Sequence, residues 1–170
     1  DAEGSFQICL GERLLPAWSD LNPHLLMAEV ESNGQTLSFS LGHRTFTAEG
    51  KKLLLNGQPV FLRGTLECCV FPMTGYPPMD PGPWRKIMAK SKEFGLNHIR
   101  FHSWCPPEAA FLAADEVGII LQVELPVWTG KWPMSSGPEL MDFCRREAFR
   151  ILEAYSHHPS FCLFSLGNEM

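Results

Sequence analysis

The pattern of apolar and polar positions divides the chain near residue 59. Upstream, apolar residues alternate with polar ones in short runs, typical of half-buried strands. These runs, separated by turn residues such as Asn33-Gly34 and Asn56-Gly57, cover residues 6–10, 25–31, 35–40, 45–48 and 52–55. The pattern predicts an all-β domain over residues 1–59. A complete β-sandwich has about seven strands, so we expect only part of one.

Downstream, over residues 60–170, apolar strand-like runs alternate with segments of helical periodicity. The predicted strands cover residues 60–66, 98–102, 119–123 and 161–166, and the predicted helices cover residues 83–94, 108–117 and 138–157. Strictly alternating strands and helices predict an α/β fold with a parallel sheet and right-handed crossovers. Four strands amount to half of a (β/α)8 TIM barrel. An open doubly wound sheet is the alternative, but no Gly-x-Gly-x-x-Gly follows the first strand.

Composition narrows the class of protein. The chain has 170 residues, 45% hydrophobic, with a net charge of −5 and no basic stripe, which argues against nucleic acid as a partner. No apolar run reaches the ~18 residues of a spanning helix, so no membrane partner is expected. The first residues lack a signal peptide pattern, and cytoplasmic, periplasmic and secreted locations all stay open.

Cysteine and histidine spacing gives no metal site. The six cysteines include no Cys-x-x-Cys pair, so we expect mostly free thiols and no structural zinc. The adjacent His157 and His158 resemble a metal-binding pair, but they fall at a predicted helix end. A solvated helix terminus, favoured by the helix dipole, is the preferred interpretation.

Polar residues gather at the carboxyl ends of the predicted strands. In residues 98–102, Arg100 and His102 share one face, because side chains alternate across a strand. Glu124 ends the next strand, and a buried carboxylate needs a partner, for which Arg100 is the obvious candidate. A solvent-exposed edge strand and a purely structural ion pair are the alternatives.

The last predicted strand leads into Gly167, Asn168 and Glu169. A carboxylate at this end of a barrel strand is positioned for catalysis, whereas the alternative is an exposed glutamate of no special role. Aromatic side chains also crowd the predicted loops, where they suit the C–H faces of sugars or simply pack: Phe71, Tyr76, Trp84, Trp104, Trp128 and Trp132.

Five segments, in order, resemble glycoside hydrolase family 2, the β-galactosidase and β-glucuronidase family. Ser165-Leu166-Gly167-Asn168-Glu169 is similar to its acid/base motif, and residues 54–64, Leu-Leu-Asn-Gly-Gln-Pro-Val-Phe-Leu-Arg-Gly, to its junction between immunoglobulin-like domain and barrel. Residues 18–25, 41–45 and 97–100 resemble its Trp-Ser…Asn-Pro-x-Leu, Gly-x-Arg and Asn-x-x-Arg segments. The resemblance covers nearly the whole chain.

The resemblance implies a retaining glycosidase that cleaves terminal β-glycosidic bonds without an organic cofactor. Glu169 would be the acid/base and Asn168 would bind the sugar 2-hydroxyl. Arg100 would support the site and Glu124 would lie near its floor. The segment after residue 100 departs from the family pattern, so His102 or Trp104 would take over substrate contacts, with Trp128 among the sugar-binding aromatics.

The family's nucleophile belongs on a seventh strand, which this chain does not reach, and its magnesium ligands have no clear match here. We therefore expect a fragment that is inactive alone and is completed by the remainder of a parent chain, with a carbohydrate as substrate and homo-oligomerisation left open. A non-catalytic carbohydrate-binding protein with a barrel-derived sugar site is the alternative function.

Overall fold

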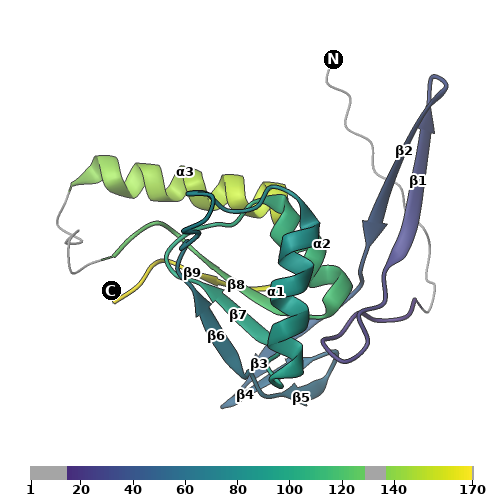
Figure 1. Cartoon of the computed structure of the whole chain (residues 1–170), viewed down its shortest axis with the longest axis horizontal. Helices are drawn as coiled ribbons and strands as arrows, with labels where there is room; N and C mark the ends of the chain where they lie inside the picture. The colour runs from purple at the N-terminus through teal and green to yellow at the C-terminus, as the bar shows by residue number, and fades with distance from the viewer. Residues whose placement is uncertain (1–14, 129–136, 170) are drawn as a thin grey trace.

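The computed structural model describes residues 15–128 and 137–169. The expected strand 6–10 lies outside these residues. The upstream part forms two small antiparallel sheets (Figure 1). One is a hairpin of β1 (Leu26–Ser32) and β2 (Gln35–Leu41). Its turn residues Asn33 and Gly34 have φ of 51° and 74°, as a two-residue hairpin with the twist of its strands requires.

The second small sheet has three strands in the order β3-β4-β5. They are β3 (Phe46–Glu49), β4 (Lys52–Leu55) and β5 (Gln58–Val60). Strands β1 to β4 fall within one residue of the predicted runs, whereas β5 was not predicted.

The downstream part is a four-stranded parallel sheet in the order β6-β7-β8-β9. Its strands are β6 (Gly64–Glu67), β7 (His98–Phe101), β8 (Ile120–Glu124) and β9 (Phe161–Ser165). Between them lie α1 (Pro81–Glu93), α2 (Glu108–Val117) and α3 (Pro138–Tyr155). The predicted alternation of strands and helices, with neighbouring parallel strands, is confirmed.

The predicted strand 60–66 was wrong as a single element. Val60 pairs with Leu53 in the antiparallel sheet, whereas the parallel sheet begins at Gly64. Between them the backbone N–H of Arg63 donates to the Asn97 side chain at 2.8 Å. One apolar run thus serves two sheets, because the chain changes sheets within it.

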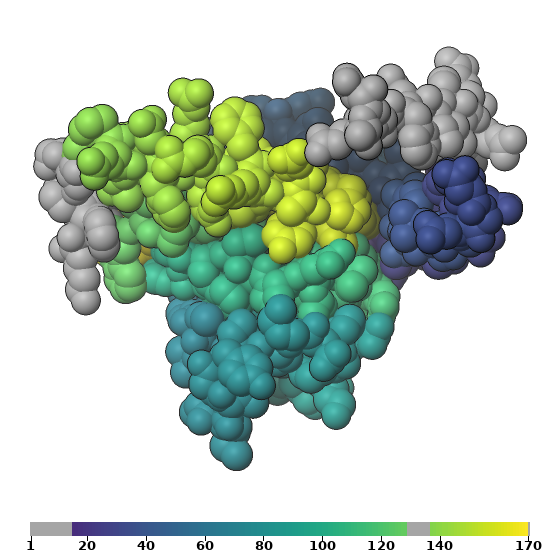
Figure 2. Space-filling view, turned by 90° about the horizontal axis from the view of Figure 1, so that it is seen from above, coloured from purple at the N-terminus to yellow at the C-terminus, as the bar shows by residue number. Residues whose placement is uncertain are grey.

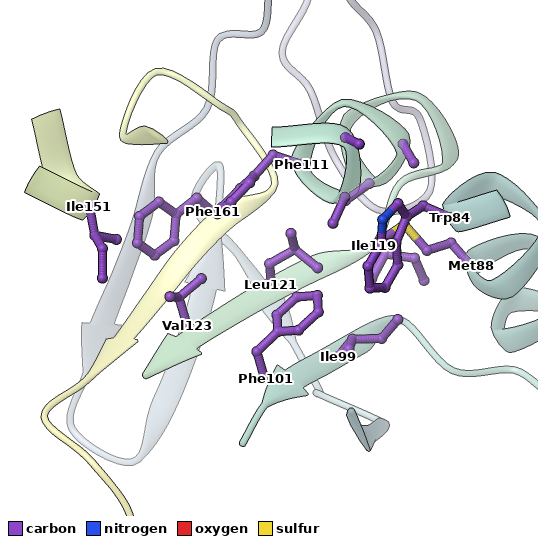
Figure 3. Close-up of a cluster of buried hydrophobic side chains, with 14 of the residues drawn as sticks. Trp84, Met88, Ile99, Phe101, Phe111, Ile119, Leu121, Val123, Ile151 and Phe161 are labelled. Carbon is purple, nitrogen blue, oxygen red and sulfur yellow. The ribbon is translucent and has the colours of Figure 1, made fainter. Parts of the chain in front are cut away.

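The three helices pack on one face of the parallel sheet. In Figure 3 the side chains of Ile99, Phe101, Leu121 and Val123 point toward this helix layer. The helices contribute large buried residues to the same core, including Trp84, Met88, Phe111 and Ile151. Figure 2 shows α3, α2 and α1 following one another across this outer face. The expected contact between the apolar strand face and the helices is confirmed.

Among the described residues, no helix combines the length and the apolar character needed to cross a bilayer.

Candidate active site

Arg100 joins the carboxyl ends of three parallel strands. Its Nε donates to Glu124 Oε1 at 2.5 Å, across the β7–β8 pair. Its Nη2 donates to Asn168 Oδ1 at 2.7 Å, just after β9. The expected pairing of Arg100 with Glu124 is confirmed. A planar guanidinium suits two acceptors in fixed directions, so this side chain sets the relative positions of the other two.

Glu124 is fully buried and is held by several donors. Besides Arg100, the Ser103 hydroxyl donates to its Oε2 at 3.1 Å and Gln122 Nε2 to its Oε1 at 3.5 Å. Sequence reasoning missed Ser103, whose only signal is its place directly after the second parallel strand. The peptide bond between His102 and Ser103 is cis. These hydrogen bonds hold the Glu124 carboxylate in one position at the carboxyl end of β8.

Asn168 and Glu169 follow β9 and turn toward the segment after β8. The backbone N–H of Asn168 donates to Val127 O at 2.9 Å, and the Asn168 side chain is buried. Glu169 is exposed, with φ of 53°, a region that few non-glycine residues adopt. Its Oε2 accepts a hydrogen bond from Trp128 Nε1 at 2.5 Å. The Glu169 carboxylate is therefore at the rim, beside a tryptophan.

A pocket of about 350 Å³ opens next to these groups, and it is lined by Cys68, His102, Ser103, Pro126, Val127 and Trp128. The His102 ring meets Trp128 edge to face, with centroids 4.8 Å apart. Trp128 keeps 45% of its surface exposed, so an apolar ring face is available at the mouth. Cys68, from the loop after β6, was not predicted.

Trp104 lies apart from this pocket. Its ring packs edge to face on Phe101 with centroids 5.4 Å apart, and its Nε1 donates to Glu67 O at 3.2 Å. Contact with substrate therefore stays a prediction for Trp104. Glu67 ends β6, and burial raises the pKa of its carboxyl, while hydrogen bonds, chiefly from the backbone N–H of Cys69, oppose the shift.

Trp84 and the histidine pair after α3 lie outside the candidate site. The ring of Trp84 is fully buried in the helix core, and Trp132 lies outside the described residues. The expectation that His157 and His158 form a solvated helix end was wrong for His158, which is 3% exposed. Its Nδ1 lies 2.6 Å from Asp115 Oδ2, a partner 43 residues away that sequence spacing could not reveal.

Comparison with known proteins places this arrangement among glycosidases. The chain is 32% identical over 162 residues to a β-galactosidase of Arthrobacter sp. (strain B7), covering 89% of this chain and 16% of that protein. It superposes on apo β-glucuronidase 3 of Bacteroides uniformis with a TM-score of 0.74 at 30% identity, covering 91% of this chain and 20% of that one. A Ruminococcus gnavus β-glucuronidase in complex with D-glucuronic acid gives a TM-score of 0.79 at 25% identity, covering 92% and 27%. No family model matches.

The fold and these similarities identify the chain as related to glycosidases, the enzymes that act on O-glycosyl compounds. Within that class, the chain is a relative of the β-galactosidases and β-glucuronidases of glycoside hydrolase family 2. It spans about a sixth of the length of the curated relatives that it matches.

Proposed function

We propose that the protein carrying this chain is a retaining glycoside hydrolase that cleaves terminal β-glycosidic bonds. The observation that carries the proposal is the single network in which Arg100 ties buried Glu124 to Asn168, directly beside the rim carboxylate of Glu169. Such a carboxylate at the end of a barrel strand suits proton transfer to a leaving group.

In this proposal each polar group has a distinct role. Glu169 protonates the glycosidic oxygen and then removes a proton from the attacking water. The Trp128 N–H holds one carboxylate oxygen of Glu169, which orients the other toward substrate. Because Asn168 Oδ1 accepts from Arg100, its Nδ2 group remains to donate to a sugar hydroxyl. His102 and Trp128 supply an edge and a face to the sugar ring.

The second carboxyl of a retaining pair lies about 5–5.5 Å from the first. Glu124 does not suit that task, because it is fully buried and both of its oxygens accept hydrogen bonds. We infer that the nucleophile comes from the part of the parent protein outside these residues. Correspondingly, we assign residues 1–59 to part of an immunoglobulin-like β-sandwich and residues 60–170 to the first half of a (β/α)8 barrel.

Anion rescue tests the acid/base assignment. In Glu169→Ala, an aryl β-glycoside with a good leaving group should still glycosylate the enzyme, but the intermediate should persist because no base activates water. Azide should then attack the anomeric carbon, displace the enzyme carboxylate and release a β-glycosyl azide. Both aryl β-galactosides and aryl β-glucuronides should be tried with the complete protein.

Glu153→Gln, an exposed change on α3, is the matched control and should keep wild-type turnover. Unaltered hydrolysis by Glu169→Ala would exclude the assigned role. Sugar binding without turnover by the complete wild-type protein would favour the alternative, a non-catalytic carbohydrate-binding protein. Efficient Glu169-dependent hydrolysis by the 170-residue polypeptide alone would refute the inference that the nucleophile lies elsewhere.

A further inference from the structure

A second polar cluster lies away from the candidate active site, where α2 meets the turn that follows α3. Glu108, His157 and His158 each place a possible metal-ligand atom within 4.8 Å of the others. In Figure 2 the yellow end of α3 lies against the green surface of α2. The ring of Phe111 on α2 also stacks on that of Tyr155 at 4.4 Å. The cluster therefore sits on a packed junction between two helices.

His158 is prepared as a ligand by its surroundings. Its Nδ1 lies 2.6 Å from Asp115 Oδ2, and in the neutral tautomer with its proton on Nδ1 the ring donates to this carboxylate. The Nε2 lone pair is then free, and this buried atom has no hydrogen-bond partner among the described residues. A carboxylate that orients the far nitrogen of a histidine is the usual support for a metal-binding imidazole.

Asp115 is itself held in place. Its Oδ1 accepts from the backbone N–H of Ser160 at 3.0 Å, and its backbone oxygen accepts from Trp18 Nε1 at 2.8 Å. The histidine ring also lies between neighbours, because Phe111 stacks on it with centroids 5.2 Å apart. The orientation of His158 is thus fixed before any ion arrives, and a fixed ligand lowers the entropic cost of binding.

We propose that Glu108, His157 and His158 bind one Zn²⁺ ion, with Asp115 as the supporting carboxylate and a water molecule as fourth ligand. Two imidazoles and one carboxylate are a ligand set that zinc accepts in tetrahedral geometry. Zinc–ligand distances of about 2.0–2.2 Å place tetrahedral ligands roughly 3.3–3.6 Å apart. The side chains of Glu108 and His157 are exposed, so they can rotate inward onto the fixed His158.

The ion would join α2 to the turn that leads into β9, the strand that delivers Asn168 and Glu169. Its role in this proposal is to stabilise that junction, because none of its ligands belongs to the candidate active site. The proposal is therefore independent of the glycosidase assignment.

Metal titration of the complete protein tests the site. Zn²⁺ binding is measured by calorimetry, and Co²⁺ replaces it to give a visible spectrum. We expect one tetrahedral Co²⁺ site without a thiolate charge-transfer band, which separates this cluster from the exposed Cys68 and Cys69. Glu108→Gln and His157→Gln should each weaken Zn²⁺ binding by more than ~100-fold, the upper end for loss of a mere supporting partner.

Glu153→Gln and His24→Gln are matched controls of the same chemistry placed elsewhere, and both should bind Zn²⁺ as the wild type does. Zn²⁺ should also raise the unfolding temperature of the wild type and of the controls, but not of the two ligand variants. Wild-type affinity in Glu108→Gln and His157→Gln, or a thiolate band in the Co²⁺ spectrum, would overturn the proposal. Because both substituted residues are exposed, the variants should remain folded, and circular dichroism can verify this.

Discussion

Replacing Arg100 by Met should destabilise the parallel sheet more than replacing both members of its ion pair. The Arg100→Met variant leaves the Glu124 carboxylate fully buried, with only the neutral donors of Ser103 and Gln122. In the double variant, Arg100→Met with Glu124→Met, neither charge of this pair remains. Apolar replacement of a whole buried pair is often nearly neutral, whereas removing one partner costs several kcal/mol.

The geometry sets the size of the effect. At the observed N–O distance of 2.5 Å, an effective dielectric constant of ~20 gives about 7 kcal/mol of gross attraction. Desolvation of both groups offsets much of this. The Arg100 side chain also keeps 30% of its surface exposed, so we take the low end of the range for breaking a buried pair, about 3 kcal/mol. The double variant should lie within ~1 kcal/mol of the wild type.

Hydrogen exchange of the backbone amides in β8 and β9, measured on the complete protein, reports the opening free energy of this sheet. The two single variants, the double variant and the wild type form a thermodynamic cycle. The idea of a coupled, buried pair would be refuted if the double variant lost as much opening free energy as Arg100→Met, or the sum of the two single losses. Arg100→Lys is a useful fourth substitution, because it keeps the charge but not the planar fork that reaches both Glu124 and Asn168.

Three shorter predictions follow from other contacts. Gly118→Ala should lower the free energy of unfolding by ~1–3 kcal/mol. Its φ is +83°, and a Cβ there would lie 2.6 Å from a backbone oxygen. Gly34→Ala, whose Cβ would meet nothing within 4 Å, should cost less. Burial and a nearby arginine lower the pKa of His98, so the unfolded chain binds more protons than the folded chain. The free energy of unfolding should therefore fall as the pH drops below ~6.5. Urea unfolding at several pH values should show a weaker pH dependence for His98→Gln. Trp128→Phe removes the N–H donor to Glu169 and should lower kcat/KM by ~10–100-fold, most strongly for substrates with poor leaving groups.

Local sequence signals were sufficient for the order of the downstream elements. The predicted helix 108–117 has the observed bounds, because Pro107 precedes it and Gly118, with φ of 83°, ends it. Such signals depend on neighbouring residues only. They failed between residues 60 and 64, where an apolar run could not show that the chain leaves one sheet for another.

The sequence predicted those side chains of the candidate site whose positions depend on strand geometry alone. Alternation along each strand predicted that Arg100 and Glu124 lie on the polar faces of neighbouring strands, where they could pair. Ser103 and Cys68 were missed, because their positions depend on how loops fold back over the sheet. The burial of His158 was missed for a similar reason, since its partner Asp115 is distant in sequence and becomes close only when α2 packs against the end of α3.

The chain changes from antiparallel to parallel sheet between Val60 and Gly64, close to the proposed division at residue 59, but the packing continues across this change. Trp18 from the upstream part is fully buried and donates to the backbone of Asp115 in α2. Arg44 Nη2 donates to the backbone oxygen of Phe161 in β9 at 2.7 Å, and Asn97 Nδ2 donates to Asp20 Oδ2 at 2.8 Å. Because these bonds use backbone groups and buried amides that would otherwise lack partners, the upstream residues stabilise the sheet that carries the site. The two parts should therefore unfold together, although their sheets differ in topology.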